Sequence, residues 1–181
     1  MKRSLFAAAV AGTVLLAMPF AAHAQSTVTK PVQFGISGGA ALPTSDLSDI
    51  ANTGFNVGGH LGFNPAMIPL GIRVDGAYNR WAFKQGVDGD VHTWSVTGNA
   101  LYKIPSASVS PYLLGGAGWY QFAGAVTGVG SGSENDFGWN VGGGISMPLS
   151  GFDTFIEAKY TQIQTDGSSV KFVPITFGIM F

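Results

Sequence analysis

Residues 171–181, KFVPITFGIMF, alternate between apolar side chains and others that are mostly smaller or polar. The apolar positions recur at every second residue: Val173, Ile175, Phe177, Ile179 and Phe181. Successive side chains of a β-strand point to opposite faces, so this segment predicts a strand with one continuous apolar face. Such a face must lie against a protein core or against lipid, and the rest of the chain distinguishes these two settings.

The amino-terminal residues have the three parts of a secretory signal peptide. Residues 2–3 are basic, residues 5–20 are almost wholly apolar, and the sequence AHA at 22–24 is a small-x-small cleavage site. The apolar run is short and is followed at once by the cleavage site, which favours a signal peptide over a retained membrane anchor. We therefore predict a cleaved segment at 1–24 and one exported domain at 25–181.

The composition of the mature segment excludes several classes of protein. It has 157 of the 181 residues and no cysteine, so it is long enough for one domain but has no disulfide or thiolate metal site. Without the two basic residues of the signal peptide, seven basic side chains face ten acidic ones, and this charge of −3 argues against a nucleic-acid partner. Only 10% of the chain is charged, and no later apolar run is long enough for a spanning helix. Contact with lipid would therefore require a closed β-barrel.

Eight segments of the mature chain are predicted strands, and six of them alternate clearly between two kinds of side chain. The segments are 32–42, 53–64, 70–83, 91–104, 111–122, 136–147, 152–163 and 171–181. One face carries Val, Ile, Leu and aromatic side chains, while the other collects Gly, Ser, Thr, Asn and nearly every charge within a strand. A soluble lipocalin-type barrel would have its apolar side chains inside. An even number of strands also brings the last beside the first and removes exposed sheet edges.

Segment 111–122 has apolar residues or glycine on both faces, so its alternation does not fix which face points outward. Our preferred outward residues in this segment are Tyr112, Leu114, Tyr120 and Phe122. Aromatic side chains also gather near the strand ends, as expected at the two interfaces of a membrane. Those near one rim are Phe63, Tyr102, Phe152 and Phe181, and those near the other are Phe55, Trp94, Phe122, Phe137 and Tyr160. The alternative is a soluble β-sandwich in which these aromatic side chains pack in the core, but it leaves the signal peptide and the low charge unexplained.

Three segments, KFVPITFGIMF, PYLLGGAGWYQF and FIEAKY, resemble strands of the small outer-membrane barrel proteins of the opacity, OmpX and OmpA type. The resemblance extends over the whole mature chain. It implies an all-β fold, namely an eight-stranded, antiparallel, up-and-down transmembrane β-barrel in the outer membrane. It also implies that the terminal strand is the assembly signal read by the barrel-assembly machinery. Outer-membrane lipid is the second implied partner, and no cofactor is implied.

The connections between the predicted strands differ in length and composition. Those after the second, fourth and sixth strands are short on the whole and contain proline, whereas the others are mostly longer and polar. The longest loop, residues 123–135, is rich in Gly and Ser. In outer-membrane barrels, short turns face the periplasm and longer loops face outward. The pattern therefore predicts that both termini are periplasmic.

Six polar side chains on the predicted inward face form a candidate interior network. They are His60, Arg73, Asp75, Asn99, Glu157 and Lys159. Strand pairing places His60 near Arg73 and Asp75, and the next hairpin brings Asn99 to the same region. An eight-stranded barrel is only wide enough for its own side chains, and buried charges need partners. We interpret the network as a structural plug, with a proton- or ion-conducting path as the alternative.

The resemblance favours a non-enzymatic barrel that contributes to the cell envelope and presents short loops, for which the sequence identifies no extracellular ligand. A narrow porin-type pore is the second hypothesis, and a lipid A-modifying enzyme is the third. The local cluster suited to lipid chemistry is His92 with Asp88, Asp90 and Ser95. His92 and Ser95 are predicted to face opposite ways, which argues against catalysis there. The glycine-rich run GVGSGSEND lacks the strand–helix context of a phosphate-binding loop.

We predict that deletion of Phe181 impairs membrane assembly far more than Phe34→Ala does, because Phe181 continues the apolar alternation of the predicted assembly signal. The measurement is the amount of heat-modifiable barrel, seen as a change of gel mobility on boiling. Normal amounts of barrel in the deletion variant would contradict the assignment of an assembly signal.

Overall fold

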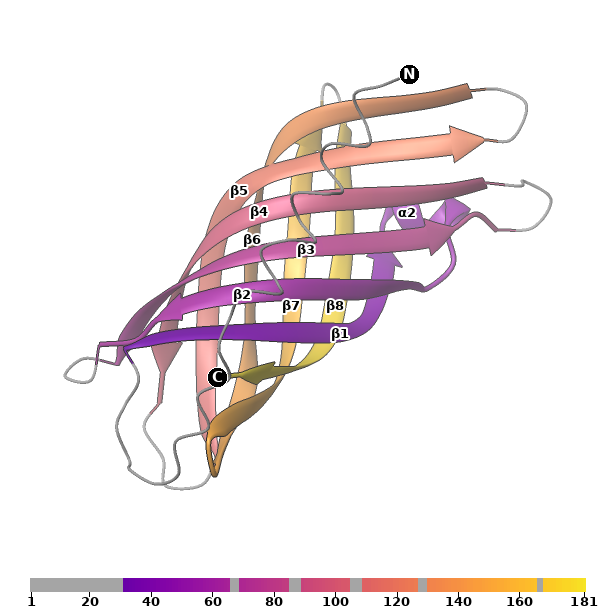
Figure 1. Ribbon diagram of the computed structural model, residues 1–181. Helices are drawn as coiled ribbons and strands as arrows, with labels where there is room; N and C mark the ends of the chain where they lie inside the picture. The colour runs from indigo at the N-terminus through magenta and orange to yellow at the C-terminus, as the bar shows by residue number, and fades with distance from the viewer. Residues whose placement is uncertain (1–30, 66–68, 85–88, 105–108, 127–129, 166–167) are drawn as a thin grey trace, which may run out of the picture.

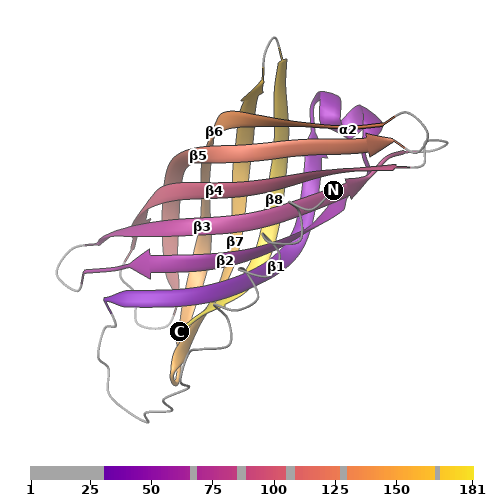
Figure 2. The same cartoon turned by 45° about the horizontal axis from the view of Figure 1, so that its top comes forward.

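The structure is a computed structural model that describes residues 31–65, 69–84, 89–104, 109–126, 130–165 and 168–181. Nearly all of these residues lie in strands (Figures 1 and 2). The strands are β1 (Val32–Thr44), β2 (Gly54–Phe63), β3 (Leu70–Ala82), β4 (Gly89–Lys103), β5 (Ser110–Val126), β6 (Gly130–Leu149), β7 (Phe152–Thr165) and β8 (Ser168–Met180). The short helix α2 (Asp46–Ile50) follows β1. The predicted signal peptide lies outside the described residues.

The eight strands form one closed barrel in which each strand is antiparallel to its neighbours in the sequence. Closure is made by β1 and β8, which pair from Gly35 opposite Met180 to Thr44 opposite Lys171. The backbone of Phe181 continues this pairing, since its N–H donates to the Phe34 carbonyl over 2.7 Å. The structure confirms the predicted eight-stranded, up-and-down barrel, and the closed pairing leaves the barrel wall without a free edge.

The structure differs from the prediction of a loop over 123–135 at the residues of this range that it describes, and residues 127–129 lie outside the described residues. Residues 123–126 belong to β5 and 130–135 to β6, and they pair in register from Ala123 opposite Ser133 to Val126 opposite Gly130. We call the end of the barrel that carries the connections after β1, β3, β5 and β7 the loop end, and the other end the turn end. Figure 1 shows β5 and β6 running side by side to the loop end. Gly and Ser are weak strand formers, but a hairpin that is already paired extends through them because no residue there breaks the ladder.

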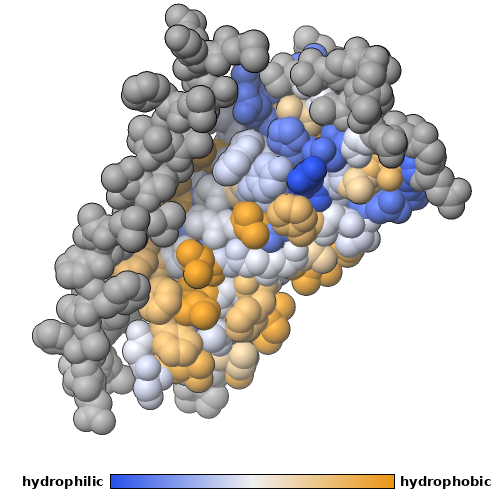
Figure 3. All heavy atoms as spheres, turned by 45° about the vertical axis from the view of Figure 1, so that its right-hand side comes forward, coloured by the Kyte–Doolittle hydropathy of each residue, from blue (hydrophilic) through white to orange (hydrophobic). Residues whose placement is uncertain are grey.

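The outer surface of the barrel is apolar over most of its height. Figure 3 shows hydrophobic side chains over the lower part of the visible face and hydrophilic ones toward the loop end. Side chains as large as Ile72 and Trp119 are 62% and 71% exposed. In contrast, the alternate residues Arg73 and Asn79 are buried inside. The barrel is therefore inverted relative to a soluble protein, as the alternation predicted.

The preferred phase of the fifth strand was wrong. Tyr112, Leu114 and Tyr120 are each only 3% exposed and point inward, while Leu113 and Trp119 are outside. Register decides this, because Tyr120 pairs with the inward Ser95 and Tyr112 with Lys103. Glycines on β6 leave space for both rings: a Cβ at Gly144 would lie 2.7 Å from the Tyr112 hydroxyl, and one at Gly138 would lie 2.7 Å from the Tyr120 ring.

The interior also contains two apolar layers that the sequence did not predict. The layer at the loop end consists of Ala41, Leu47, Ala51, Trp81, Val91, Tyr120, Ile163 and Phe172. Trp81 is fully buried, stacks edge-on against Phe172 and donates its indole N–H to the Ala41 carbonyl over 3.0 Å. Leu47 of α2 packs onto this layer, so the helix closes the loop end. The layer at the turn end consists of Leu101, Tyr112, Leu114, Phe155 and Met180.

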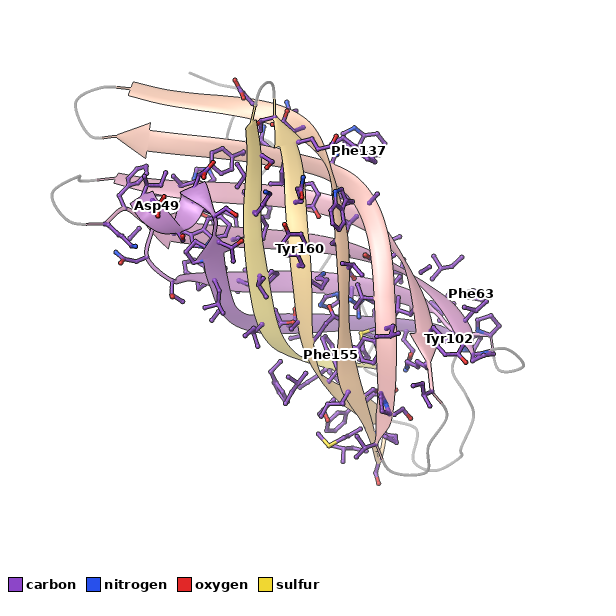
Figure 4. The ribbon with its side chains drawn as sticks, turned by 180° about the vertical axis from the view of Figure 1, so that it is seen from behind. Asp49, Phe63, Tyr102, Phe137, Phe155 and Tyr160 are labelled. Carbon is purple, nitrogen blue, oxygen red and sulfur yellow. The ribbon has the colours of Figure 1, made fainter. Side chains whose placement is uncertain are left out.

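Aromatic rings surround the barrel near both rims, largely as predicted. At the turn end Phe63 of β2 and Tyr102 of β4 are exposed, and Figure 4 labels both at the same end of the barrel. At the loop end Trp94 is exposed and its ring lies 4.7 Å from that of Tyr78. Phe122 is an exception, because it is partly buried against the apolar layer at the loop end. Its inward position follows from the corrected phase of β5.

Inward and outward glycines should respond differently to an added methyl group. A Cβ at the inward Gly142 would overlap the Ala158 carbonyl oxygen and lie 2.8 Å from the Cα of Lys159, whereas one at the outward Gly98 meets no atom within 4 Å. We predict that Gly142→Ala lowers the free energy of unfolding by about 1–3 kcal/mol, and that Gly98→Ala changes it by less than about 0.5 kcal/mol. Urea unfolding in lipid vesicles measures both, and equal effects would contradict the described backbone contacts.

Candidate functional site: a charged network inside the barrel

The structure brings all six predicted interior side chains together at mid-height in the barrel. The hairpin of β2 and β3 places His60 directly opposite Asp75, and the hairpin of β3 and β4 places Arg73 opposite Asn99. Five of the six are at most 8% exposed, and Lys159 is partly buried. The alternating pattern of β7 adds Glu157 and Lys159 from the other side of the barrel, with the neighbouring Ile156 facing outward.

Asp75 is the most heavily contacted member of the network. Its Oδ1 lies 2.7 Å from His60 Nδ1 and accepts a hydrogen bond from Arg73 Nε, also over 2.7 Å. Its Oδ2 accepts hydrogen bonds from Arg73 Nη2, Asn99 Nδ2 and Lys159 Nζ over 3.0, 3.0 and 3.2 Å. A buried carboxylate is costly unless it is paired and hydrogen-bonded, and these four partners meet that requirement.

Glu157 provides the second carboxylate and is contacted by Nη2 of Arg73, the nitrogen that also donates to Asp75 Oδ2. Arg73 Nη2 donates to both Glu157 oxygens over 2.8 Å, so the guanidinium joins β3 to the non-adjacent strand β7. Its carbon also lies 5.8 Å above the ring of Phe155. Lys159 Nζ is 3.6 Å from Glu157 Oε1. Two cations thus meet two carboxylates, and the four charges compensate one another within the interior.

Tyr112 belongs to this network although the sequence analysis placed it outside. Its hydroxyl donates to Glu157 Oε2 over 2.7 Å. Ser37 was also missed, and its hydroxyl lies 2.8 Å from His60 Nε2. Ser37 alternates with the outward apolar residues of its strand, so the sequence pattern alone could have placed its side chain inside the barrel. Tyr112 had no such signal, because both faces of β5 are apolar.

Small residues opposite the network leave space for its long side chains. Gly142 and Gly144 of β6 pair with Lys159 and Glu157. On β8, Thr176 pairs with Glu157, whereas Gly178 pairs with Phe155 and receives its ring. The network therefore occupies the cross-section of the barrel because the neighbouring strands provide almost no side-chain volume there.

Two small cavities lie on either side of the network. Each has a volume of about 20 Å³, which is enough for about one water molecule. The cavity toward the loop end is lined by Ser37, His60, Ser95 and Lys159, among others. The cavity toward the turns is lined by Lys103, Tyr112 and Asp153, among others. The charged network separates the two spaces.

The cluster considered for lipid chemistry does not form a catalytic arrangement. Ser95 is 9% exposed and points into the barrel, whereas His92 is on the outer face with Trp94. His92 Nδ1 lies 3.5 Å from Asp90, and Asp90 instead forms a bidentate ion pair with Arg80. Asp88 lies outside the described residues. The described part of the chain also has no group of three or more His, Cys, Asp or Glu side chains suited to a metal ion.

The five residues of the predicted assembly signal lie in the closing strand and just after it. Ile175 and Phe177 are exposed on the outer face, and Val173 and Ile179 are half-buried on the same face. The ring of Phe181 lies 5.7 Å from Phe34 and 6.2 Å from Phe152. Their placement completes the outer wall at the seam of the barrel. Recognition by the assembly machinery stays a prediction.

A closed barrel with an apolar exterior and self-compensated charges inside defines the class of integral outer-membrane β-barrels. No helix among the described residues has the length and apolar character needed to cross a membrane. The chain belongs to the outer membrane protein beta-barrel domain family, whose model matches residues 10–181. A comparison with curated protein sequences gave no match.

Solved structures of outer-membrane barrels share the fold. Neisserial surface protein A is 19% identical, with a TM-score of 0.68, and the alignment covers 83% of this chain and 96% of that one. Ail, the attachment invasion locus protein of Yersinia pestis, is 25% identical with a TM-score of 0.51, covering 83% and 97%. A major outer membrane protein from Thermus thermophilus is 14% identical with a TM-score of 0.55, covering 83% and 98%.

We predict that Asp75→Asn is much more destabilising than Tyr112→Phe. The asparagine removes a charge that Arg73 and Lys159 both contact, which leaves buried positive charge uncompensated and costs about 3–5 kcal/mol. The phenylalanine removes one hydrogen bond from Glu157, which keeps Arg73 as a partner, and costs about 1 kcal/mol. The free energy of unfolding in lipid vesicles measures the difference. A larger loss for Tyr112→Phe would show that Asp75 is not the centre of the network.

Proposed function

We propose that this protein is an integral outer-membrane barrel with a structural role in the cell envelope, and that its interior is a plug. In this proposal the protein neither conducts ions nor modifies lipid. It contacts outer-membrane lipid through its apolar wall and is inserted by the barrel-assembly machinery. Both termini are periplasmic, and the loop end faces outward.

The observation that carries the proposal is the position of Arg73. Its side chain forms ion pairs with Asp75 on its own strand and with Glu157 on β7, across the barrel. An eight-stranded barrel is only wide enough for its side chains to fill. A guanidinium fixed by two carboxylates therefore occupies the space that an ion would need, and moving it would leave buried charges unpaired. The apolar layer of Leu47 and Trp81 closes the loop end as a second barrier.

The long hairpin of β5 and β6 supports the outward presentation of the loop end. Glu134 and Asn135 are exposed on this hairpin, as is Asp49 on α2 (Figure 4). Polar, solvent-exposed strand ends are suited to the aqueous side of a membrane protein and not to its hydrocarbon. The similarity to Ail, whose name describes an attachment protein, supports a surface-presented role and leaves the ligand of this chain open.

A narrow pore is the second candidate, and the paired cavities favour it. They lie above and below the network and are each large enough for a water molecule. A rearrangement of Arg73 and Lys159 would join them. In this alternative the same residues act as a gate instead of a permanent plug.

Conductance in planar bilayers distinguishes the plug from the pore. We expect the wild-type barrel to show no conductance steps. We expect steps from the triple variant Arg73→Ala, Glu157→Ala, Trp81→Ala, because it removes a buried ion pair and the loop-end indole together.

The outward variant Ile72→Ala is the control and should behave as the wild type, since Ile72 lies on the lipid-facing wall. Heat-modifiable gel mobility shows that each variant is a folded barrel. Steps from the wild-type protein at the level of the triple variant would contradict the plug and favour the pore.

A further inference from the structure

The hairpin of β5 and β6 extends further at the loop end than the pairing between β6 and β7. β5 and β6 pair as far as Val126 opposite Gly130, whereas β6 and β7 pair no further than Phe137 opposite Gln164. Figures 1 and 2 show β3, β4, β5 and β6 lying side by side in this region, with β6 at the margin. Residues 130–136 of β6 therefore have a partner strand on one side only.

The opposite margin of this extended sheet, on β3, is closed by the segment around α2. The Asn52 N–H donates to the Ala82 carbonyl over 2.9 Å, and the Lys84 N–H donates to the Ile50 carbonyl over 2.8 Å. The backbone hydrogen bonds described for the chain include no such contact for 130–136. Alternate residues of this segment therefore direct their N–H and C=O groups away from β5. An edge of this kind is a template for a further strand.

The segment 130–136 lacks the features that block strand addition. Its sequence, GSGSEND, contains neither proline nor lysine, which native proteins place on exposed edges to prevent pairing. There is also space beside it, because a Cβ at Gly132 would meet no atom within 4 Å. The edge lies outside the barrel interior, so a partner reaches it directly from the water on the loop side. Strand addition needs only backbone groups for its affinity.

The side chains of the segment determine which partner fits. Glu134 is exposed and Asp136 is partly exposed, and the two share one face because they are two residues apart. The segment has no basic residue that would offset them. Side chains on a neighbouring antiparallel strand lie about 4.5–5.5 Å away, where opposite charges attract and like charges repel. A strand with basic side chains at every second position is therefore complementary to this edge.

A second copy of the chain fits this edge poorly. It has the same acidic residues, so the two edges would repel each other. Two copies in one membrane are also related by rotation about the membrane normal, which preserves the rise of each strand and reverses its tilt. Strands of such barrels are tilted by about 35–45°, so the two edges would cross at roughly twice that angle. A flexible extended segment of another protein has no such constraint.

We propose that the free edge of β6, residues 130–136, binds an extended segment of another protein by strand addition. Backbone hydrogen bonds hold the added strand, and basic side chains at every second position pair with Glu134 and Asp136. This binding goes beyond the proposed structural role and involves the hairpin alone. A plug without it would still close the barrel, and a barrel that conducts ions would still have the edge.

The test uses the full mature barrel, folded in phospholipid nanodiscs, and a nine-residue peptide of alternating threonine and lysine. Hydrogen exchange of single backbone amides, followed by NMR, is measured with and without the peptide. We expect alternate amides within 131–136 to exchange at least about 10-fold more slowly when the peptide is bound, because they become hydrogen-bonded. The amides between them already face β5 and should change little. A peptide with proline in place of threonine keeps the charge but does not form a regular strand, and should give no protection.

Two charge variants test the contribution of the side chains. Glu134→Lys should weaken binding of the threonine–lysine peptide by about 3-fold or more, because a like charge replaces an opposite one beside the added strand. Asp49→Lys makes the same change of charge on the exposed α2, at the closed margin (Figure 4), and should leave the affinity at the wild-type value. Heat-modifiable gel mobility shows that both variants are folded.

Four outcomes would overturn the proposal. They are unchanged exchange within 131–136, equal protection by the proline peptide, equal loss of affinity in Asp49→Lys, and protection of the same amides in concentrated barrels without any peptide. The last of these would assign the edge to a second copy of the chain.

Discussion

Closure of the sheet by β1 and β8 is the constraint on which the rest of this structure depends. Backbone N–H and C=O groups have no water to bond with in hydrocarbon, so every strand needs a partner on both sides. The pairing of Gly35 with Met180 through Thr44 with Lys171 meets this need at the seam. Once the wall is closed, its outward residues meet lipid and its inward residues must pack in a narrow space. The apolar exterior and the crowded interior both follow from closure.

The inward side chains are arranged in layers along the barrel. Apolar residues fill the two ends, and charged residues fill the middle, where Arg73 connects Asp75 to Glu157. Charge is tolerable there because each carboxylate has several donors and the four charges compensate one another. The glycines of β6 and β8 provide the volume that these long side chains occupy. The proposed plug is a consequence of a polar network enclosed at this depth.

Much of the fold was predictable because strand alternation has a period of two and faces two very different media. The strands, their order, the outward Ile72 and the inward pairing of His60 with Asp75 all follow from it. The length of the β5–β6 hairpin was not predictable, because Gly and Ser have only weak strand propensities. Their strand conformation depends on the backbone pairing between β5 and β6. The apolar layer around Trp81 was also missed, because inward positions were expected to be polar throughout.

The sequence by itself determined that the chain forms a closed barrel, which faces were apolar, and which charges lay in one region of the interior. Only the tertiary structure decided the phase of β5, because both of its faces are apolar and the register with Ser95 and Lys103 turns Tyr120 and Tyr112 inward. It also decided which atoms meet. Alternation places Ser37, His60 and Asp75 on one face, but the ring orientation that joins them over 2.8 and 2.7 Å depends on side-chain packing across three strands.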